Sequence, residues 1–251
     1  MKIIRSILLA VIAVEAAMSC YFVVGRLSRA NPPSIDSRRL DPVTAADLQR
    51  IRKRAADGVS RDWRELAEAY LGNGYYVAAE QCFRHAADLV PEDRQAQYGR
   101  GFCLERIGRT KEAIEVLSET AASAAPELAR TCWYQIGRCF LREEKAQEAE
   151  TAFRKISDFQ PAAYQLAKLF IRLDRANEAI PVLEQLLAVM PNSLKLLQLR
   201  RHAAEALGDK ALVTELRDRE DRAEYQLVLE YGQSFISMFA ARYGLSKILS
   251  G

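Results

Sequence analysis

Residues 63–91 of the chain read WRELAEAYLGNGYYVAAEQCFRHAADLVP. Small and large apolar residues recur in this stretch at helical spacing, and Pro91 closes it. A small residue such as Ala67 lets two helices approach closely, while large ones such as Trp63 and Phe83 fill the space between them. The stretch therefore predicts two packed helices, of which the second ends at the proline.

The same pattern returns along the chain with a period near 35 residues. Trp63 and Trp133 lie 70 residues apart, which is two periods. The prolines that close the pattern, at steps of 35, 35 and 30 residues, are Pro91, Pro126, Pro161 and Pro191. A fixed period in this range indicates stacked units, because one unit cannot bury its apolar face alone.

The residues at these positions resemble the tetratricopeptide repeat family, whose pattern is Trp, Leu-Gly and Tyr, then Ala, Phe and Pro. The first copy has Trp63, Leu66, Ala67, Tyr70, Ala79, Phe83, Ala86 and Pro91. The third has Trp133, Ile136, Gly137, Phe140, Ala149, Phe153 and Pro161. Weaker copies contain Gly101, Leu104, Gly108, Ala113 and Leu117, then Leu166, Ala167, Phe170, Ala179, Leu183 and Pro191, and a fifth covers 194–220. The resemblance implies an all-α, right-handed solenoid of four to five helix pairs.

The composition is typical of a helical chain and disfavours several classes of function. Gly and Pro number only 12 and 8, which disfavours a β-sandwich or barrel. The net charge is +3, so a strongly basic nucleic-acid binder is not expected. The five Cys show no CxxC spacing, and two His do not suggest a metal site. With no nucleophile–base or metal-ligand spacing, the sequence predicts a protein that is not an enzyme and has no cofactor or metal.

The chain divides into five predicted segments. These are a membrane anchor or signal segment (1–29), a linker (30–41), a leading helix (42–58), the solenoid (59–221) and a C-terminal amphipathic capping helix (222–251). The leading helix is predicted to begin where Asp41 caps and Pro42 takes the first helical position.

The N-terminal segment contains a largely apolar run of 20 residues, 6–25. This length allows one helix to cross a bilayer, and a single-pass anchor is the favoured interpretation. Cleavage as a signal peptide after Ala17-Met18-Ser19, or lipid attachment at Cys20, are the alternatives. Glu15 is costly near the middle of a span, so it is either protonated or in contact with another membrane helix.

The orientation of this segment stays open at the level of sequence. A short basic N-terminus followed by an apolar run is typical of an export signal, which favours a solenoid outside the cytoplasm. Four arginines on the other side favour the cytoplasm: Arg26, Arg29, Arg38 and Arg39.

Candidate binding residues come from the resemblance, because the first helix of each tetratricopeptide repeat lines a concave surface. Residues spaced by four on these helices share one face, and they are Tyr98, Phe102, Arg106, Tyr134, Arg138, Arg142, Tyr164, Lys168 and Arg172. Tyrosine supplies apolar contact and arginine binds carboxylates. The pattern predicts a groove for an extended, acidic peptide. Alternatively, the tyrosines fill gaps between repeats and the cations are solvated.

Two classes of function follow. The first is a membrane-tethered scaffold that binds a protein partner in this groove. The second is an accessory or assembly subunit of a membrane enzyme or secretion complex. It would use the N-terminal helix and a C-terminal aromatic stripe, Tyr231, Phe235, Phe239 and Tyr243. The stripe either caps the last repeat or serves for docking or self-association. Single residues with no catalytic pattern are interpreted as structural: Cys82, Cys103, Cys132, Cys139, His85 and His202.

The apolar run leads to a direct test of membrane attachment. The intact protein is expected to sediment with membranes and to resist extraction by high salt or carbonate, because a 20-residue apolar span remains in the bilayer when surface charges are screened. Recovery of a soluble mature form that starts at Cys20 or later would contradict the anchor.

Overall fold

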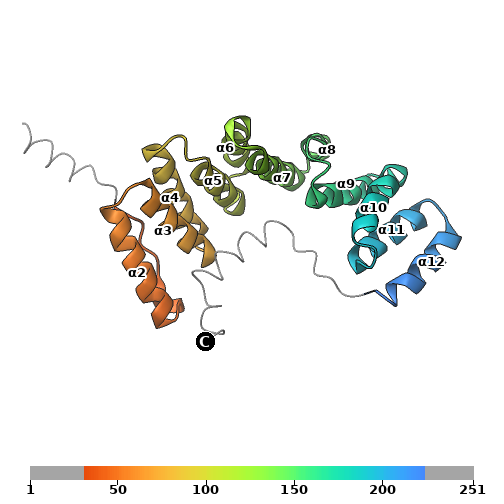
Figure 1. Cartoon of the computed structure of the whole chain (residues 1–251), viewed down its shortest axis with the longest axis horizontal. Helices are drawn as coiled ribbons and strands as arrows, with labels where there is room; N and C mark the ends of the chain where they lie inside the picture. Colours follow the sequence, from red (N-terminus) through yellow and green to blue (C-terminus); the bar gives the residue numbers. More distant parts are fainter. Residues whose placement is uncertain (1–30, 224–251) are drawn as a thin grey trace, which may run out of the picture.

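The computed structural model describes residues 31–223. Over this range the chain is an all-α solenoid of eleven α-helices without a strand (Figure 1). Residues 1–30 and 224–251 lie outside the described residues, and with them the predicted membrane segment and nearly all of the predicted capping helix. None of the helices within 31–223 combines the length and apolar character needed to cross a bilayer.

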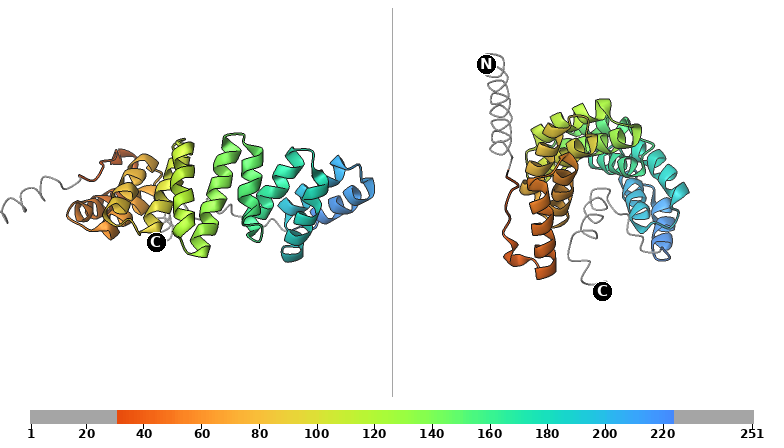
Figure 2. Two further views of the ribbon diagram at one scale, coloured as in Figure 1. Left: turned by 90° about the horizontal axis from the view of Figure 1, so that it is seen from above. Right: turned by 60° about the vertical axis from the view of Figure 1, so that its left-hand side comes forward.

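Five helix pairs follow a 3-10 turn, η1 (Ser37–Arg39), and a leading helix, α2 (Pro42–Ala56). We call the first helix of a pair the A helix and the second the B helix. The pairs are α3 (Ser60–Gly72) with α4 (Tyr76–Leu89), α5 (Arg94–Arg106) with α6 (Thr110–Ser123), α7 (Pro126–Arg142) with α8 (Ala146–Arg154), α9 (Gln160–Arg172) with α10 (Ala176–Val189), and α11 (Leu194–Ala206) with α12 (Lys210–Glu220). They stack in chain order into an arch (Figure 2).

The turn inside each pair has the same conformation five times along the described chain. In each turn one residue has a positive φ. This residue is a glycine in three turns (Gly74, Gly108 and Gly208) and an acidic residue in the other two (Glu144 and Asp174). The next N–H then donates to a carbonyl five residues earlier, as from Tyr75 to Tyr70 and from Asp209 to Ala204. The weak fifth copy therefore folds as a helix pair like the others.

Glycines set how closely the helices of the arch approach. A Cβ on Gly101 would lie 2.6 Å from Leu117 of α6, and one on Gly137 would lie 2.5 Å from Phe153 of α8. On the opposite side of α5, a Cβ on Gly99 would lie 2.5 Å from the Phe83 ring of α4. Such distances are below van der Waals contact, so these positions accept only glycine without movement of a neighbour.

The core consists of two hydrophobic clusters that meet at the third pair, where the partly buried Trp133 and Phe140 pack against both. Trp133, expected from the repeat pattern to be a buried ring, is only partly buried. The short α8 ends at Arg154, and the Lys155 ammonium lies 3.6 Å from the centre of the indole ring. One face of the indole is thus covered by a lysine side chain.

Part of the predicted linker is bound to the leading helix α2 and to the first helix pair. The Arg52 guanidinium donates hydrogen bonds to the carbonyl oxygens of Pro32 and Pro33, at 3.1 and 3.2 Å from Nε. The Tyr70 hydroxyl donates to the Pro33 carbonyl at 2.7 Å, and burial raises the pKa of Tyr70 to about 12. The Tyr75 hydroxyl donates to the Asp36 carbonyl at 2.9 Å. Residues 32–36 are therefore fastened along α2 and α3.

The glycine contacts predict that one glycine-to-alanine substitution within a helix destabilises the protein. Gly137→Ala should lower the free energy of unfolding by about 1–3 kcal/mol, because the new methyl group would press on Phe153. Helix propensity alone predicts the opposite, a gain of about 1 kcal/mol. Chemical denaturation of the two proteins distinguishes these signs, and adding Phe153→Leu should recover part of the loss. A more stable Gly137→Ala variant would contradict the close approach.

Candidate protein-binding surface

One side of each A helix turns toward the hollow of the arch. Successive residues of an α-helix are rotated by about 100°. On α5, Gly99 faces α4 and Gly101 faces α6. The side chains of Tyr98 and Phe102 leave the helix between these two directions. Because α6 and α8 lie on the outer side of the arch (Figure 1), this side of α5 faces inward. We call the corresponding residues the inner face: Tyr98, Phe102 and Arg106 of α5, Tyr134, Arg138 and Arg142 of α7, and Tyr164, Lys168 and Arg172 of α9.

The aromatic residues of the inner face do not form the open wall predicted from the sequence. Tyr98, Phe102 and Tyr134 are 2%, 0% and 1% exposed, and Tyr164 is half-buried. The Tyr134 ring lies 6.0 Å from that of Phe153 and 5.8 Å from that of Phe159, between ring centres. Large apolar rings are more stable out of water, and the three buried rings are not freely available to a partner.

The cations of α5 and α7 converge on a residue that the sequence pattern did not single out, Glu105. Its side chain is 1% exposed. The nearest guanidinium nitrogens of Arg142, Arg138 and Arg106 lie 2.8, 3.7 and 3.5 Å from its carboxylate. Arg142 also donates to the backbone carbonyl of Glu105. Three guanidinium groups thus share one carboxylate, which leaves a local surplus of two positive charges. We call these four residues the Glu105 cluster.

The Glu105 cluster contains one hydrogen-bond donor that has no partner among the described residues. Arg138 Nη1 is buried and has no hydrogen-bond partner within the described chain. The Arg142 side chain is 43% exposed, so the cluster reaches the surface there. Next along the inner face, Lys168 and Arg172 of α9 are exposed and form no ion pair within residues 31–223. Of the predicted cations, Arg106, Arg138 and Arg142 thus pair with a buried carboxylate, whereas Lys168 and Arg172 are exposed.

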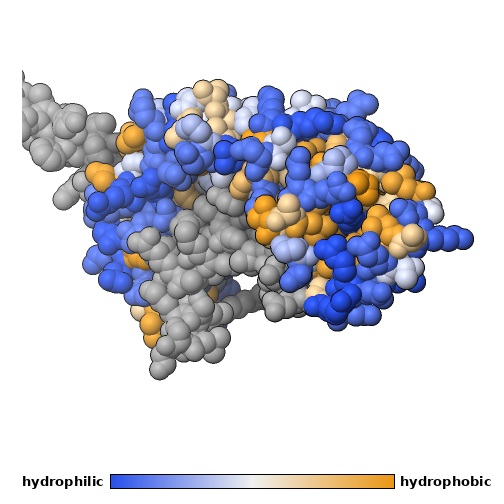
Figure 3. Space-filling view, turned by 45° about the vertical axis from the view of Figure 1, so that its right-hand side comes forward, coloured by the Kyte–Doolittle hydropathy of each residue, from blue (hydrophilic) through white to orange (hydrophobic). Residues whose placement is uncertain are grey.

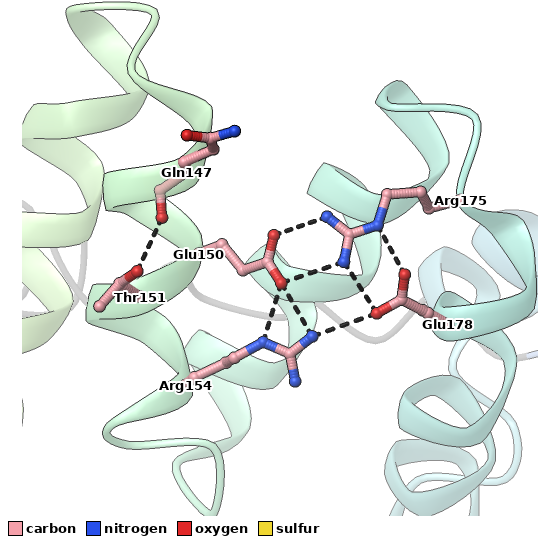
Figure 4. Close-up of polar contacts among 6 residues, drawn as sticks. All are labelled: Gln147, Glu150, Thr151, Arg154, Arg175 and Glu178. Carbon is pink, nitrogen blue, oxygen red and sulfur yellow. Dashed lines mark hydrogen bonds and ion pairs between the residues drawn. The ribbon is translucent and has the colours of Figure 1, made fainter.

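A second arginine cluster joins the third and fourth pairs and is electrically balanced (Figure 4). Arg175 contacts Glu150 at 2.7 Å and Glu178 at 2.6 Å, and Arg154 contacts the same two carboxylates at 2.8 and 3.1 Å. Hydrogen bonds from Arg175 lower the pKa of both Glu150 and Glu178. With two arginines and two glutamates the charges cancel, so this cluster links helices and offers no surplus to a ligand.

The environments of Cys132, Cys139 and His85 indicate structural roles for these residues. Burial raises the pKa of Cys132 and of Cys139 to about 12, which leaves both thiols protonated and unreactive. The centre of the His85 ring lies 4.1 Å from that of the Trp63 ring, and the two ring planes are tilted by 58°. Within the part of the chain that the structure describes, no three His, Cys, Asp or Glu side chains are grouped so as to hold a metal ion.

Comparison with known proteins agrees with the helix-pair architecture. Family models for the tetratricopeptide repeat match residues 64–127 and 161–193. These two ranges of the chain are similar to tetratricopeptide repeats. A comparison with curated proteins returned no match. A crystal structure of MamA has a TM-score of 0.56 and 16% identity over 62% of this chain and 93% of its own.

Two further structures show the same fold. The MamA RS-1 ArsTM double mutant has a TM-score of 0.58 and 15% identity, and the match covers 65% of this chain and 93% of that one. Repeats of a putative kinesin light chain from Podosopora anserina have a TM-score of 0.54 and 17% identity, with 64% and 93% covered. At such identities the likeness concerns the fold alone.

The Glu105 cluster predicts a large loss of stability on removal of its carboxylate. Glu105→Ala should lower the free energy of unfolding by about 3 kcal/mol or more, because three guanidinium groups would remain close together without a counter-charge. Glu112→Ala is the matched control, since Glu112 pairs with Arg109 at the exposed surface and should matter little. Similar denaturation midpoints for the two variants would contradict this role of Glu105.

Proposed function

We propose that this protein is a non-enzymatic scaffold whose inner face binds an extended, acidic segment of a protein partner. The observation that carries this proposal is the charge surplus of the Glu105 cluster, where three arginines share one buried carboxylate. Structural ion pairs alone do not require such an excess, as the balanced cluster around Arg175 illustrates. A carboxylate from a partner would neutralise part of this excess at Arg142, whose side chain is 43% exposed.

The exposed cations of α9 extend this site along the arch. Lys168 and Arg172 lie on α9, one helix pair after the Arg138 and Arg142 side chains of α7. Acidic residues a few positions apart on an extended segment could therefore contact both groups in turn. Each hydrogen bond from a charged donor contributes about 1.5–3 kcal/mol, so a few such contacts are enough for binding.

The proposal places this scaffold at a membrane. The apolar run 6–25 would be the anchor, with the solenoid outside the cytoplasm and Glu15 in contact with another membrane helix. Only six residues, 26–31, separate the run from Pro32, which is fastened to Arg52 of α2. The N-terminal end of the arch would thus be held close to the bilayer.

Charge reversal on α9 tests the binding site. The double variant Lys168→Glu and Arg172→Glu should bind a synthetic decaglutamate peptide at least tenfold more weakly than the wild type, as measured by fluorescence anisotropy at low salt. Both residues are exposed, so the fold should be unaffected. Arg138→Glu is unsuitable, because that side chain is only 16% exposed and is close to Glu105.

The matched control changes the net charge by the same amount elsewhere. Arg84 and Lys111 are exposed on the B helices α4 and α6, and Arg84→Glu with Lys111→Glu should alter binding less than twofold. The affinity of the wild type should also fall at high salt, because exposed charges are screened. Equal losses in the two double variants would show that only net charge matters, and would shift the proposal to an accessory subunit that uses its two ends.

A further inference from the structure

The third helix pair contains an open pocket that is separate from the inner face. It lies between α7 and α8, and its volume is about 300 Å³. Trp133 and Tyr134 are neighbours in the chain, so their side chains leave α7 about 100° apart, and only Tyr134 belongs to the inner face. We call this cavity the Trp133 pocket, and the residues that line it include Trp133, Phe140, Glu148, Thr151 and Lys155.

The Trp133 pocket already holds a positive charge from the chain itself. The Lys155 ammonium lies 3.6 Å from the centre of the indole ring, an arrangement in which the electron-rich face of the ring attracts a cation. Lys155 is exposed and forms no ion pair with any residue of 31–223. Its ammonium is thus held by the ring without a carboxylate, and it can leave the pocket for water.

The equivalent position in the first pair is occupied differently. His85 and Trp63 lie 70 residues before Lys155 and Trp133. Trp63 is 3% exposed, and burial lowers the pKa of His85, which favours its neutral ring at pH 7. A packed, neutral ring in the first pair is replaced in the third pair by an exposed charge. Packing of the repeat therefore does not account for Lys155.

A carboxylate without a counter-charge lines the same pocket. Glu148 is exposed and forms no ion pair within the described part of the chain. The outer side of the arch, which faces upward in Figure 3, is mainly hydrophilic, so a partly exposed indole beside this carboxylate is a distinct feature of that side. Aromatic ring faces and carboxylates are both groups that bind organic cations. The pocket therefore has the chemistry of a site for a cation.

In the first pair, an extended segment of the chain lies over the corresponding groove. Phe140 corresponds to Tyr70, whose hydroxyl donates to the Pro33 carbonyl at 2.7 Å. Glu148 corresponds to Ala78, which lines a cavity of about 470 Å³ together with linker residues 33–35. This side of a helix pair can thus hold an extended backbone. Among the described residues, only those of α7, α8 and Lys155 line the Trp133 pocket, so its groove is open.

We propose that the Trp133 pocket binds a basic side chain from an extended segment of a protein partner, and that Lys155 takes the place of this side chain in the free protein. The partner's cationic group would lie on the indole face and pair with Glu148. A guanidinium is well suited, because its flat shape stacks on a ring while its N–H groups reach a carboxylate. Pockets for small molecules usually exceed about 300 Å³, so this one suits a single side chain. The site differs from the inner face in preferring the opposite charge.

Nuclear magnetic resonance of the full-length protein labelled with ¹⁵N-tryptophan tests this inference. The chain has two tryptophans, and each gives one indole N–H signal. The probe is a peptide with one arginine between glycines. Its control carries citrulline, which is neutral and similar in shape, in place of arginine. The arginine peptide should shift the Trp133 signal, whereas the citrulline peptide should not. The signal of the buried Trp63 should stay unchanged with both peptides.

Two substitutions separate the parts of the site. Lys155→Gln removes the internal cation, so the arginine peptide should bind about threefold more tightly. This variant also identifies the Trp133 signal, which should shift without any peptide. Glu148→Gln should weaken binding about threefold, because the counter-charge is lost. Lys111→Gln and Glu115→Gln are the matched controls, since they change the net charge equally at exposed positions of α6 and should leave the affinity nearly unchanged.

Three results would overturn the inference. Equal shifts by the arginine and citrulline peptides would show that the pocket does not select a cation. Equal gains in Lys155→Gln and Lys111→Gln would show that only net charge matters. An unshifted Trp133 signal in both the wild type and Lys155→Gln would show that the pocket binds no basic side chain. All these variants keep Lys168 and Arg172 and the probe is basic, so failure here is separate from failure of the proposed function.

Discussion

The close contact between a glycine of one helix and a large apolar side chain of the next is the constraint on which this structure depends. Gly99 faces Phe83, Gly101 faces Leu117 and Gly137 faces Phe153, each at a distance that leaves no room for a Cβ. Because these contacts lie on two sides of the A helix, they set its rotation. The rotation decides which residues turn toward the hollow of the arch, and hence where a partner could bind.

The two arginine clusters of this arch differ in their charge balance. Around Arg175, two arginines and two glutamates form a balanced link between the third and fourth pairs. Around Glu105, three arginines share one carboxylate. A buried carboxylate is stabilised by opposite charge, and a single arginine already balances its charge. The additional arginines are therefore the feature of the inner face that packing does not explain.

Much of the fold was predictable from local sequence. The period of the prolines and small residues predicted the helix pairs, and Asp41-Pro42 marked the start of α2, where the Asp41 carboxylate accepts hydrogen bonds from two backbone N–H groups. The shared phase of Tyr98, Tyr134 and Tyr164 also followed from the repeat. These features depend on helix periodicity and on the backbone limits of glycine and proline, which act within a few residues.

The sequence by itself determined the helices, their order and the residues that share a side of each A helix. Only the tertiary structure decided that Tyr98, Phe102 and Tyr134 are buried, that Trp133 is partly exposed, and that Glu105 gathers arginines 33 and 37 positions away. Burial and ion pairing depend on the distance and rotation between neighbouring helices. These arise from the sum of many contacts across pairs, and no single segment encodes them.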